Sequence, residues 1–322
     1  MNSAQLQALT DRLSGKRVLL IGETILDVYV YGHAIGKSAE TPTLVAKELE
    51  TKQSLGGACL VARNLLELGS AVDFITLVGD DAEANVLNEY AHPKLNKILI
   101  IDPLRRTTCK KRYWVDGYKL LQFDTLDNKA LSEDLQRQTA TVIERALLHA
   151  DVVVVSDYRH GFLARSLIDS IVRLCSEQRK PLFVDSQVSQ TQANHTDYRG
   201  ADVFCLNLKE AQCIDPGFRP ERSASAFATL MEKLDTRCVV VKLGADGCLA
   251  SLRGAIIESP ALKISAVDPC GAGDAFLAAL CLGDLAQPEE TLRLANIWAG
   301  LSTLVHGAQP ASRPELLKLL AS

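Results

Sequence analysis

A glycine-rich turn near the C-terminus carries residue types suited to holding an anionic group. It reads Asp268-Pro269-Cys270-Gly271-Ala272-Gly273-Asp274, after a β-type run at 261–267 and before an apolar, helix-like run at 275–280. Two glycines at a strand-to-helix turn let several N–H groups point at one spot. The dipole of the following helix adds positive potential there. The turn therefore predicts an anion hole.

Asp274 stands at the mouth of that predicted helix, beside the place where an anion would bind. A carboxylate in this position can accept the proton of a hydroxyl group while a phosphoryl group is transferred to it. An N-capping aspartate in an ordinary glycine-rich loop would have the same local sequence. The turn alone leaves both interpretations open, so the rest of the chain decides between them.

Composition limits the class of protein. The chain has 322 residues, of which 47% are hydrophobic and 23% charged, which suits one large α/β domain or two small ones. A net charge of −4 argues against nucleic acid and anionic membrane as partners. We find no apolar run near the ~20 residues of a membrane span, and no signal peptide in residues 1–16. Nine scattered cysteines without zinc-site spacing are typical of reduced thiols, so we expect a soluble cytoplasmic protein.

Short apolar runs alternate with helical patterns along most of the chain. Predicted buried strands lie at 17–22, 72–78, 151–155, 181–184, 201–206 and 238–242. Helical spacing is found at 57–68, 134–149, 163–179, 224–234 and 292–305. This alternation predicts an α/β fold with a mostly parallel sheet that is covered by helices on both faces.

Two segments interrupt the alternation. Residues 28–54 are strand-rich and half polar, and residues 105–124 look like a hairpin that turns at Asp116-Gly117. We interpret both as strands of a small β-structure outside the main sheet. Extra edge strands of the main sheet are the alternative.

Several motifs occur in a fixed order along the chain. They are Gly56-Gly57-Ala58 through Gly69 to Val78-Gly79-Asp80-Asp81, then Ser156-Asp157-Tyr158 with Gly161, Asn207-Leu208-Lys209-Glu210, Lys242-Leu243-Gly244 with Gly247, and the turn ending at Asp274. Over nearly its whole length the chain resembles the ribokinase-like (PfkB) carbohydrate kinases. Within that family it is most similar to the kinase domain of bacterial D-glycero-D-manno-heptose-7-phosphate kinases.

The resemblance implies a three-layer α/β/α ribokinase-like fold with a small β-lid. It implies one kinase domain over residues 1–322, with lid segments 28–54 and 105–124, and a homodimer joined through the lid. The implied reaction transfers the γ-phosphoryl group of ATP to a hydroxyl of a sugar or sugar phosphate. ATP and Mg²⁺ are the implied cofactors, and a monovalent cation near the loop before Asp268 is a further option in this family.

The resemblance also assigns roles to residues. The catalytic group is Asp274 as the base, with the N–H groups of Gly271, Ala272 and Gly273 as the anion hole. The substrate side is Asp27, Gly56, Gly57, Lys110, Arg112 and Asp157. The ATP side is Asn207, Glu210, Lys242, Gly244, Gly247 and Asn296, with Glu210 organising Mg²⁺ through water.

Elementary chemistry agrees with these roles but leaves simpler interpretations open. Asp27 follows the first predicted strand, where a carboxylate can accept two sugar hydroxyls; a surface-loop aspartate is the less favoured alternative. Glu210 could be a solvated residue at a helix start. Lys110 and Arg112 share one face of a strand, which could face either a sugar phosphate or solvent. Core packing is the default for Trp298 in the late helix.

The chain departs from the family pattern at several positions. Pro269 replaces a threonine in the turn, although the glycine amides remain. Leu60 replaces an asparagine, and Gln187, Gln122 and His160 stand where basic residues are expected. Apart from Pro269, these changes fall on expected substrate-side positions, and three of them remove fixed positive charge. We therefore expect an active kinase whose substrate differs from heptose 7-phosphate, with a lower negative charge as one option.

Two alternatives from other classes remain open. One is a degenerate kinase that binds nucleotide or sugar as a regulator or scaffold, which Pro269 and the substituted positions suggest. The other is a nucleotide-binding module of a larger pathway enzyme, since heptose kinases are often fused to a nucleotidyltransferase. Because the sequence ends at Ser322, shortly after the last predicted helix, we expect a separate protein to supply any such activity.

Overall fold

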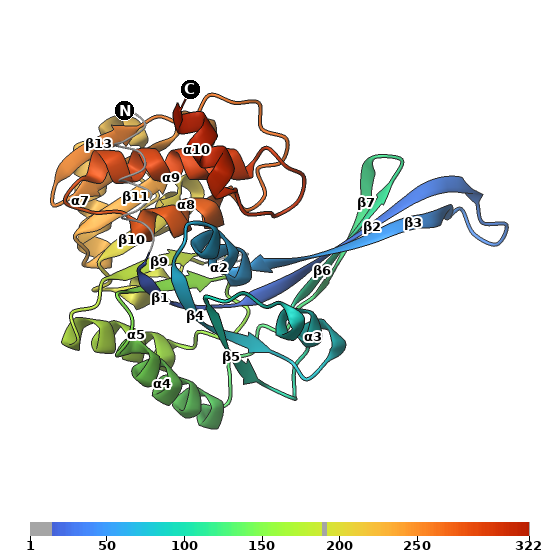
Figure 1. Cartoon of the computed structure of the whole chain (residues 1–322), viewed down its shortest axis with the longest axis horizontal. Helices are drawn as coiled ribbons and strands as arrows, with labels where there is room; N and C mark the ends of the chain where they lie inside the picture. Colours follow the sequence, from blue (N-terminus) through green and yellow to red (C-terminus); the bar gives the residue numbers. More distant parts are fainter. Residues whose placement is uncertain (1–14, 189–191, 322) are drawn as a thin grey trace.

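A nine-stranded sheet forms the centre of the molecule (Figure 1). The computed structural model describes residues 15–188 and 192–321. Within these residues the strand order is β13 (Ala255–Ser259), β12 (Cys248–Leu252), β11 (Cys238–Lys242), β10 (Val203–Asn207), β9 (Leu182–Ser186), β8 (Val152–Asp157), β1 (Arg17–Gly22), β4 (Ala71–Val78) and β5 (Leu95–Ile101). The strands from β11 to β5 are parallel, and β12 and β13 add an antiparallel edge.

Helices cover both faces of this sheet. One face packs against α2 (Ala58–Glu67), α3 (Ala82–Glu89), α8 (Ala272–Leu282), α9 (Pro288–Ser302) and α10 (Arg313–Ala321). The other packs against α4 (Glu133–Leu147), α5 (Arg165–Glu177), α6 (Leu208–Ile214) and α7 (Ser223–Leu234). Short 3₁₀ turns are η1 (His195–Tyr198), η2 (Pro220–Arg222) and η3 (Gly244–Asp246).

The apolar strands explain the two layers of helices. In β1, Val18 and Leu20 belong to one buried cluster, whereas Leu19 and Ile21 belong to the other, because successive side chains point to opposite faces. A strand that is apolar at every position must be covered on both sides. The expected three-layer α/β/α arrangement is confirmed.

A second, four-stranded sheet projects from the body (Figure 1). Its order is β3 (Leu44–Gly57), β2 (Thr24–Lys37), β6 (Cys109–Val115) and β7 (Tyr118–Thr125). The turn between β6 and β7 has positive φ at Asp116 (50°) and Gly117 (82°), as a tight hairpin requires. We call this sheet the lid; the segments 28–54 and 105–124 supply most of it.

One sequence expectation is wrong. Residues 261–267 form no strand, although their composition is β-like. The sheet edge already ends with β13, and Pro260 follows it without an N–H to donate. The segment instead runs beside α9, where a Cβ built on Gly300 would lie 3.0 Å from Leu262. The glycine-rich turn is therefore preceded by an irregular segment, not by a strand.

Across 15–188 and 192–321, every helix is too short or too polar to cross a membrane. All nine cysteines are free thiols, and seven of them are buried.

Candidate active site

A cavity of about 530 Å³ lies where the carboxyl ends of β8 to β11 meet the N-terminus of α8 and the base of the lid. Of the site residues expected from the sequence, all but Gly56 line this cavity. The structure therefore brings together residues that are up to about 270 positions apart in the chain, from Asp27 to Asn296. Carboxyl ends of parallel strands are the usual place for ligands in such sheets.

The glycine-rich turn forms the N-terminus of α8. Gly271 adopts a left-handed conformation (φ 84°), which a residue with a side chain rarely does. A Cβ there would also lie 2.4 Å from the Leu60 side chain. Within the described chain, the N–H groups of Gly271, Gly273 and Asp274 have no hydrogen-bond acceptor, whereas that of Ala272 donates to the Pro269 carbonyl at 3.2 Å. Gly271, Gly273 and Asp274, rather than Ala272, therefore have the N–H groups that the expected anion hole would use.

Asp274 lies in the first turn of α8 and faces the cavity. Burial raises the pKa of its carboxyl group to about 7; the hydroxyl of Tyr158, which donates at 2.7 Å, opposes this rise. Asp185 raises the same pKa further and Lys242 lowers it. A carboxylate with a pKa near 7 is suited to general-base catalysis at neutral pH.

Lys242 holds a positive charge beside the anion hole. A Cβ built on Gly273 would lie 3.5 Å from its Nζ atom, and Nζ donates to Asp185 at 2.5 Å. Burial alone would lower the pKa of Lys242, but the Asp185 carboxylate outweighs it and holds this pKa above its ordinary value. The ammonium group is therefore charged at every physiological pH.

Asn207 and Glu210 form a capping box at the start of α6. The Asn207 side chain accepts from the Glu210 backbone N–H at 2.9 Å, and Glu210 accepts from the Asn207 backbone N–H and side chain at 2.6 Å each. Burial and then Asp185 raise the pKa of Glu210 to about 7. The local sequence Asn-x-x-Glu explains this geometry, since the two side chains satisfy each other's backbone.

The donor set fits magnesium that arrives with ATP better than a resident metal. No cluster of three or more acidic, histidine or cysteine side chains suited to a metal occurs in the parts of the chain described. Asp185 and Glu210 nevertheless line the cavity together. Mg²⁺ typically keeps several waters and binds one or two carboxylates plus substrate phosphates.

The pairing of strands β2 and β6 places three charged residues on one face of the lid. Asp27 in β2 pairs with Lys110 in β6, and Arg112 lies two residues further along that strand. Arg112 donates to Asp27 at 2.5 Å, and both side chains are largely buried. A Cβ on Gly56 would lie 2.2 Å from Asp27 Oδ2, so this glycine makes room for the carboxylate. Asp27 therefore lies in a strand and faces the cavity, not in a surface loop.

Two of the residues expected to bind ligands use their side chains for hydrogen bonds within the protein. The Asp157 carboxylate is buried and accepts from Ser186, Asn194 and Tyr198 at 3.1, 2.8 and 2.8 Å. Asn296 donates to the Ser259 carbonyl and hydroxyl at 3.0 and 2.9 Å, which joins α9 to β13. Asp157 and Asn296 both line the cavity, but these hydrogen bonds join their polar atoms to other residues of the protein.

The departures from the family pattern separate into two groups. Leu60 and Gln187 line the cavity. Gln122 is exposed on β7, where it donates to Asp124 at 2.8 Å, and His160 Nδ1 lies 3.0 Å from Asn128 Oδ1. Neither Gln122 nor His160 lines the cavity. Pro269, the departure in the turn, also lines the cavity, so it alters the cavity wall together with Leu60 and Gln187.

Sequence reasoning missed the roles of Tyr158 and Asp185. Each comes at or just after the carboxyl end of a parallel strand, β8 and β9 respectively. The rule that ligands bind at such ends could have identified both. Trp298, by contrast, is fully buried and donates to Asn64 at 2.8 Å, as expected for a core residue.

The chain is similar to proteins of known family. A profile of the pfkB family carbohydrate kinases matches residues 16–316. The bifunctional protein HldE of Paramagnetospirillum magneticum is 32% identical over 330 residues, which cover 98% of this chain and 66% of that protein. HldE of Bradyrhizobium diazoefficiens is 31% identical, with 96% and 64% covered. The chain thus spans about two thirds of the length of these relatives.

Two solved structures have the same fold. Escherichia coli phosphofructokinase-2 in complex with potassium gives a TM-score of 0.76 at 19% identity, covering 95% of this chain and 99% of that one. Arabidopsis thaliana ribokinase with ribose and ATP gives 0.72 at 21% identity, covering 96% and 99%. With the motifs, the fold and the profile in agreement, this chain belongs to the pfkB family of carbohydrate kinases.

Proposed function

We propose that the protein is an ATP-dependent sugar kinase that phosphorylates a hydroxyl of a sugar or sugar phosphate of the heptose-phosphate-like class. One observation carries the proposal: the Asp274 carboxylate lies beside unbonded N–H groups at the start of α8, with the Lys242 ammonium next to them. A base, an anion hole and a fixed cation at one point are what phosphoryl transfer needs.

The mechanism follows from these positions. Asp274 accepts the proton of the acceptor hydroxyl as that oxygen attacks the γ-phosphorus, and the bond from this phosphorus to the β–γ bridging oxygen breaks, so that ADP leaves. The N–H groups of Gly271, Gly273 and Asp274, together with the helix dipole and Lys242, stabilise the negative charge on the transferred group. Mg²⁺, when bound with ATP, supplies further charge neutralisation, and Glu210 with Asp185 would hold it through water. Positioning and electrostatics account for most of the catalysis.

The nucleotide side is assigned to the end of the cavity near α6 and η3. Asn207, Glu210, Gly244 and Gly247 line it, and Asn296 lies in the α9 wall. Gly247 has φ 92°, and a Cβ there would lie 2.2 Å from the Ser259 carbonyl, so the loop requires glycine. A monovalent cation near Asp268 is also proposed, on the analogy of the potassium complex of the structural relative.

The sugar side is assigned to the lid base, around Asp27, Lys110 and Arg112. The Asp27–Arg112 ion pair occupies one oxygen of the carboxylate. An anionic group on the substrate would draw Arg112 away and free Asp27 for sugar hydroxyls. This favours a phosphorylated acceptor over a neutral one. Leu60 and Gln187 in the wall favour a sugar that differs from heptose 7-phosphate.

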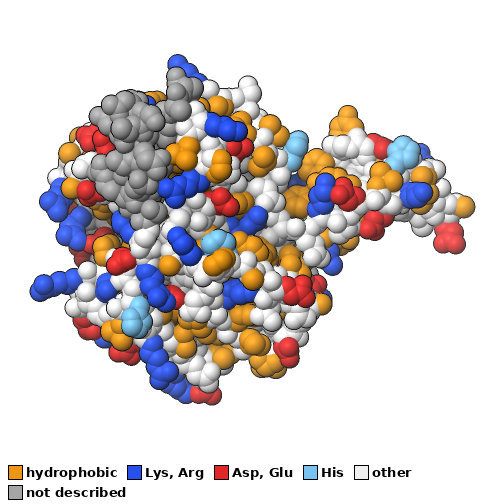
Figure 2. All heavy atoms as spheres, in the orientation of Figure 1, with side chains coloured by type: hydrophobic (Ala, Val, Ile, Leu, Met, Phe, Trp, Pro, Cys, Tyr) orange, Lys and Arg blue, Asp and Glu red, His pale blue; other side chains and the backbone are white. Residues whose placement is uncertain are grey.

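We also propose a homodimer joined through the lid, acting in the cytoplasm. Exposed hydrophobic side chains gather on its strands, among them Leu49, Tyr118, Leu121 and Phe123. Figure 2 shows hydrophobic side chains among the charged ones on the projecting sheet. Its edge strands β3 and β7 leave backbone groups unpaired, which a second copy would cover. Nine free thiols suit a reducing compartment.

Asp274→Asn should lower kcat by about 10²–10⁴-fold, because the amide cannot accept the proton. ATP binding by calorimetry should change little. In the unmodified enzyme, kcat should fall as the pH drops below about 7, where Asp274 becomes protonated. A loss of less than about tenfold would exclude Asp274 as the base. Asp169→Asn is the control: it makes the same change at an exposed side chain of α5 and should keep full activity.

The same variant should also unfold at a higher temperature at pH 8. Burial raises the pKa of Asp274 from 3.8 to about 7, so folding takes up a proton between these values. The stability that this group contributes is therefore greatest at low pH and is lost as the pH rises to about 7. Asparagine removes that penalty. An unchanged melting temperature at pH 8 would contradict the raised pKa.

Asp27→Ala should weaken sugar binding far more than ATP binding. A carboxylate that accepts sugar hydroxyls makes bonds worth about 1.5–3 kcal/mol each. Calorimetric titration should show at least about a tenfold loss of affinity for the acceptor, or about 1.4 kcal/mol. Glu48→Ala, which removes an exposed carboxylate from β3 of the same sheet, should leave both affinities unchanged. Impaired ATP binding with unchanged sugar affinity would place Asp27 on the nucleotide side.

Sugar-dependent ADP release across pentoses, hexoses and heptoses, each with and without phosphate, tests the function itself. We expect phosphorylated acceptors to be turned over best, and heptose 7-phosphate to be a poor substrate. A kcat/KM for heptose 7-phosphate at or above ~10⁴ M⁻¹s⁻¹ would show that Leu60 and Gln187 do not shift selectivity. If no sugar releases ADP while ATP still binds, the degenerate-kinase alternative is favoured.

Sedimentation equilibrium should give a mass of about twice 35.0 kDa. Replacing Leu121 and Phe123 by lysine should produce a monomer, because charge is costly in an apolar interface. Leu148→Lys, at an equally exposed leucine beyond α4, is the matched control and should remain dimeric. A monomeric wild-type protein at all concentrations would exclude the dimer.

A further inference from the structure

The phenolic hydroxyl of Tyr158 donates a hydrogen bond of 2.7 Å to Oδ1 of Asp274. Tyr158 follows β8, whereas Asp274 belongs to α8, so the bond crosses the cavity floor between two separate elements. Throughout residues 15–188 and 192–321, no other group donates to this carboxylate. Its Oδ2 atom is therefore left for a substrate hydroxyl.

We propose that Tyr158 is a positioning residue for the catalytic base: its hydroxyl holds Oδ1 and thereby directs Oδ2 toward the acceptor hydroxyl. The inference rests on the proposed function of Asp274. The terminal torsion of an aspartate is broad, so an unbonded carboxylate samples a range of orientations. A donor on one oxygen narrows that range before the substrate binds, which is the kind of preorganisation that general-base catalysis uses.

The backbone around Tyr158 is held by a buried carboxylate. Glu23, which is 2% exposed and lies between β1 and β2, accepts from the N–H groups of Tyr158, His160 and Phe162 at 2.8, 3.0 and 3.3 Å. Burial and then Asp157 raise the pKa of Glu23 to about 8. One side chain that accepts from three alternate N–H groups of the loop leaves this loop little freedom.

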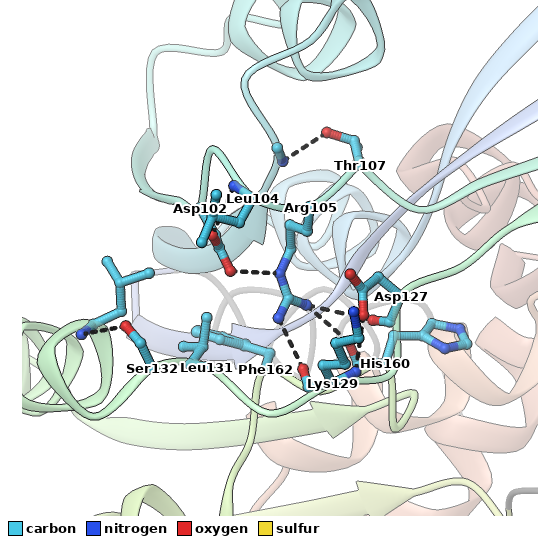
Figure 3. Close-up of polar contacts among 12 residues, drawn as sticks. Asp102, Leu104, Arg105, Thr107, Asp127, Lys129, Leu131, Ser132, His160 and Phe162 are labelled. Carbon is cyan, nitrogen blue, oxygen red and sulfur yellow. Dashed lines mark hydrogen bonds and ion pairs between the residues drawn. The ribbon is translucent and has the colours of Figure 1, made fainter.

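A second buried side chain, that of Arg105, holds the same loop through a backbone carbonyl group. The Arg105 guanidinium, paired with Asp102 at 3.0 Å, donates to the carbonyls of His160 and Lys129 at 3.1 and 2.8 Å (Figure 3). Gly161 has φ 85°, and a Cβ there would lie 2.0 Å from the Lys129 carbonyl. Tyr158 thus lies on a loop that is fixed by two buried side chains, Glu23 and Arg105, as a residue with a positional role requires.

The charges that face Asp274 come from four elements. Asp185 on β9 and Asp27 on β2 raise its pKa, Lys242 on β11 lowers it, and Cys270 lies in the preceding turn. The Tyr158 hydrogen bond lowers this pKa by stabilising the ionised form. Without the hydroxyl the pKa of Asp274 rises, so the base becomes ionised only at higher pH.

Tyr158→Phe tests the inference. The first measurement is ¹³C NMR of ligand-free protein that is labelled at the aspartate carboxyl groups. The Asp274 resonance is assigned by its loss in Asp274→Asn. In Tyr158→Phe this resonance should titrate about half to one pH unit higher than in the unmodified protein. With Mg–ATP and the best acceptor from the sugar panel, kcat should fall and the acidic limb of its pH profile should move up by the same amount. The KM for Mg–ATP should stay unchanged.

Tyr198→Phe is the matched control. It also removes a buried tyrosine hydroxyl that donates to a carboxylate, here Asp157 at 2.8 Å, but not to the base. We expect it to lower the melting temperature without moving the Asp274 titration. If Tyr158→Phe loses stability yet leaves both the titration and the pH profile unchanged, Tyr158 is merely structural and the inference fails. If instead Asp274→Asn keeps its activity, the proposed function fails first.

Discussion

The burial of α8 up to its first turn is the constraint on which the active site depends. Every side chain from Ala275 to Leu282 is buried, so the helix cannot shift without opening the core. It packs against α2 and α9, which are joined by the hydrogen bond from Trp298 to Asn64. The unbonded N–H groups and Asp274 therefore lie at the cavity because the core fixes the position of the helix. The glycine-rich turn sets only the local backbone conformation at the start of this helix.

Charge pairing is the second constraint. Lys242 and Arg112 are each paired with a carboxylate at 2.5 Å, Asp185 and Asp27 respectively. Buried charges are tolerated only in such pairs, since an unpaired one costs several kcal/mol. A phosphate that enters the cavity must therefore compete with these carboxylates for the two cations. This exchange favours anionic ligands, because a neutral ligand offers nothing in return for separating the pairs.

The lid carries both the proposed sugar side and the surface proposed for dimerisation. Strand β2 begins next to the core sheet and continues into the projecting sheet. Alternation directs Asp27 and Lys110 to the cavity, while Val28 and Lys111 face a separate hollow beside α3. Both sets of residues therefore lie on the same two strands, β2 and β6.

The sequence by itself determined the layers and the chemistry of the turn. Runs that are apolar at every position require cover on both faces, and Gly271 with Gly273 allows an N-terminus with unbonded amides. These properties are local, so spacing alone reveals them. The same reasoning was wrong at 261–267, where the strand pattern was overridden because the sheet edge was already occupied by β13.

Only the tertiary structure decided which polar groups face one another. The partnership of Tyr158 with Asp274 joins residues 116 positions apart, and that of Arg112 with Asp27 joins residues 85 apart. No periodicity encodes such pairs, because their distances depend on how whole helices and strands pack. Likewise, burial moved the pKa of Asp274 to about 7, although its sequence neighbours alone would leave an ordinary aspartate.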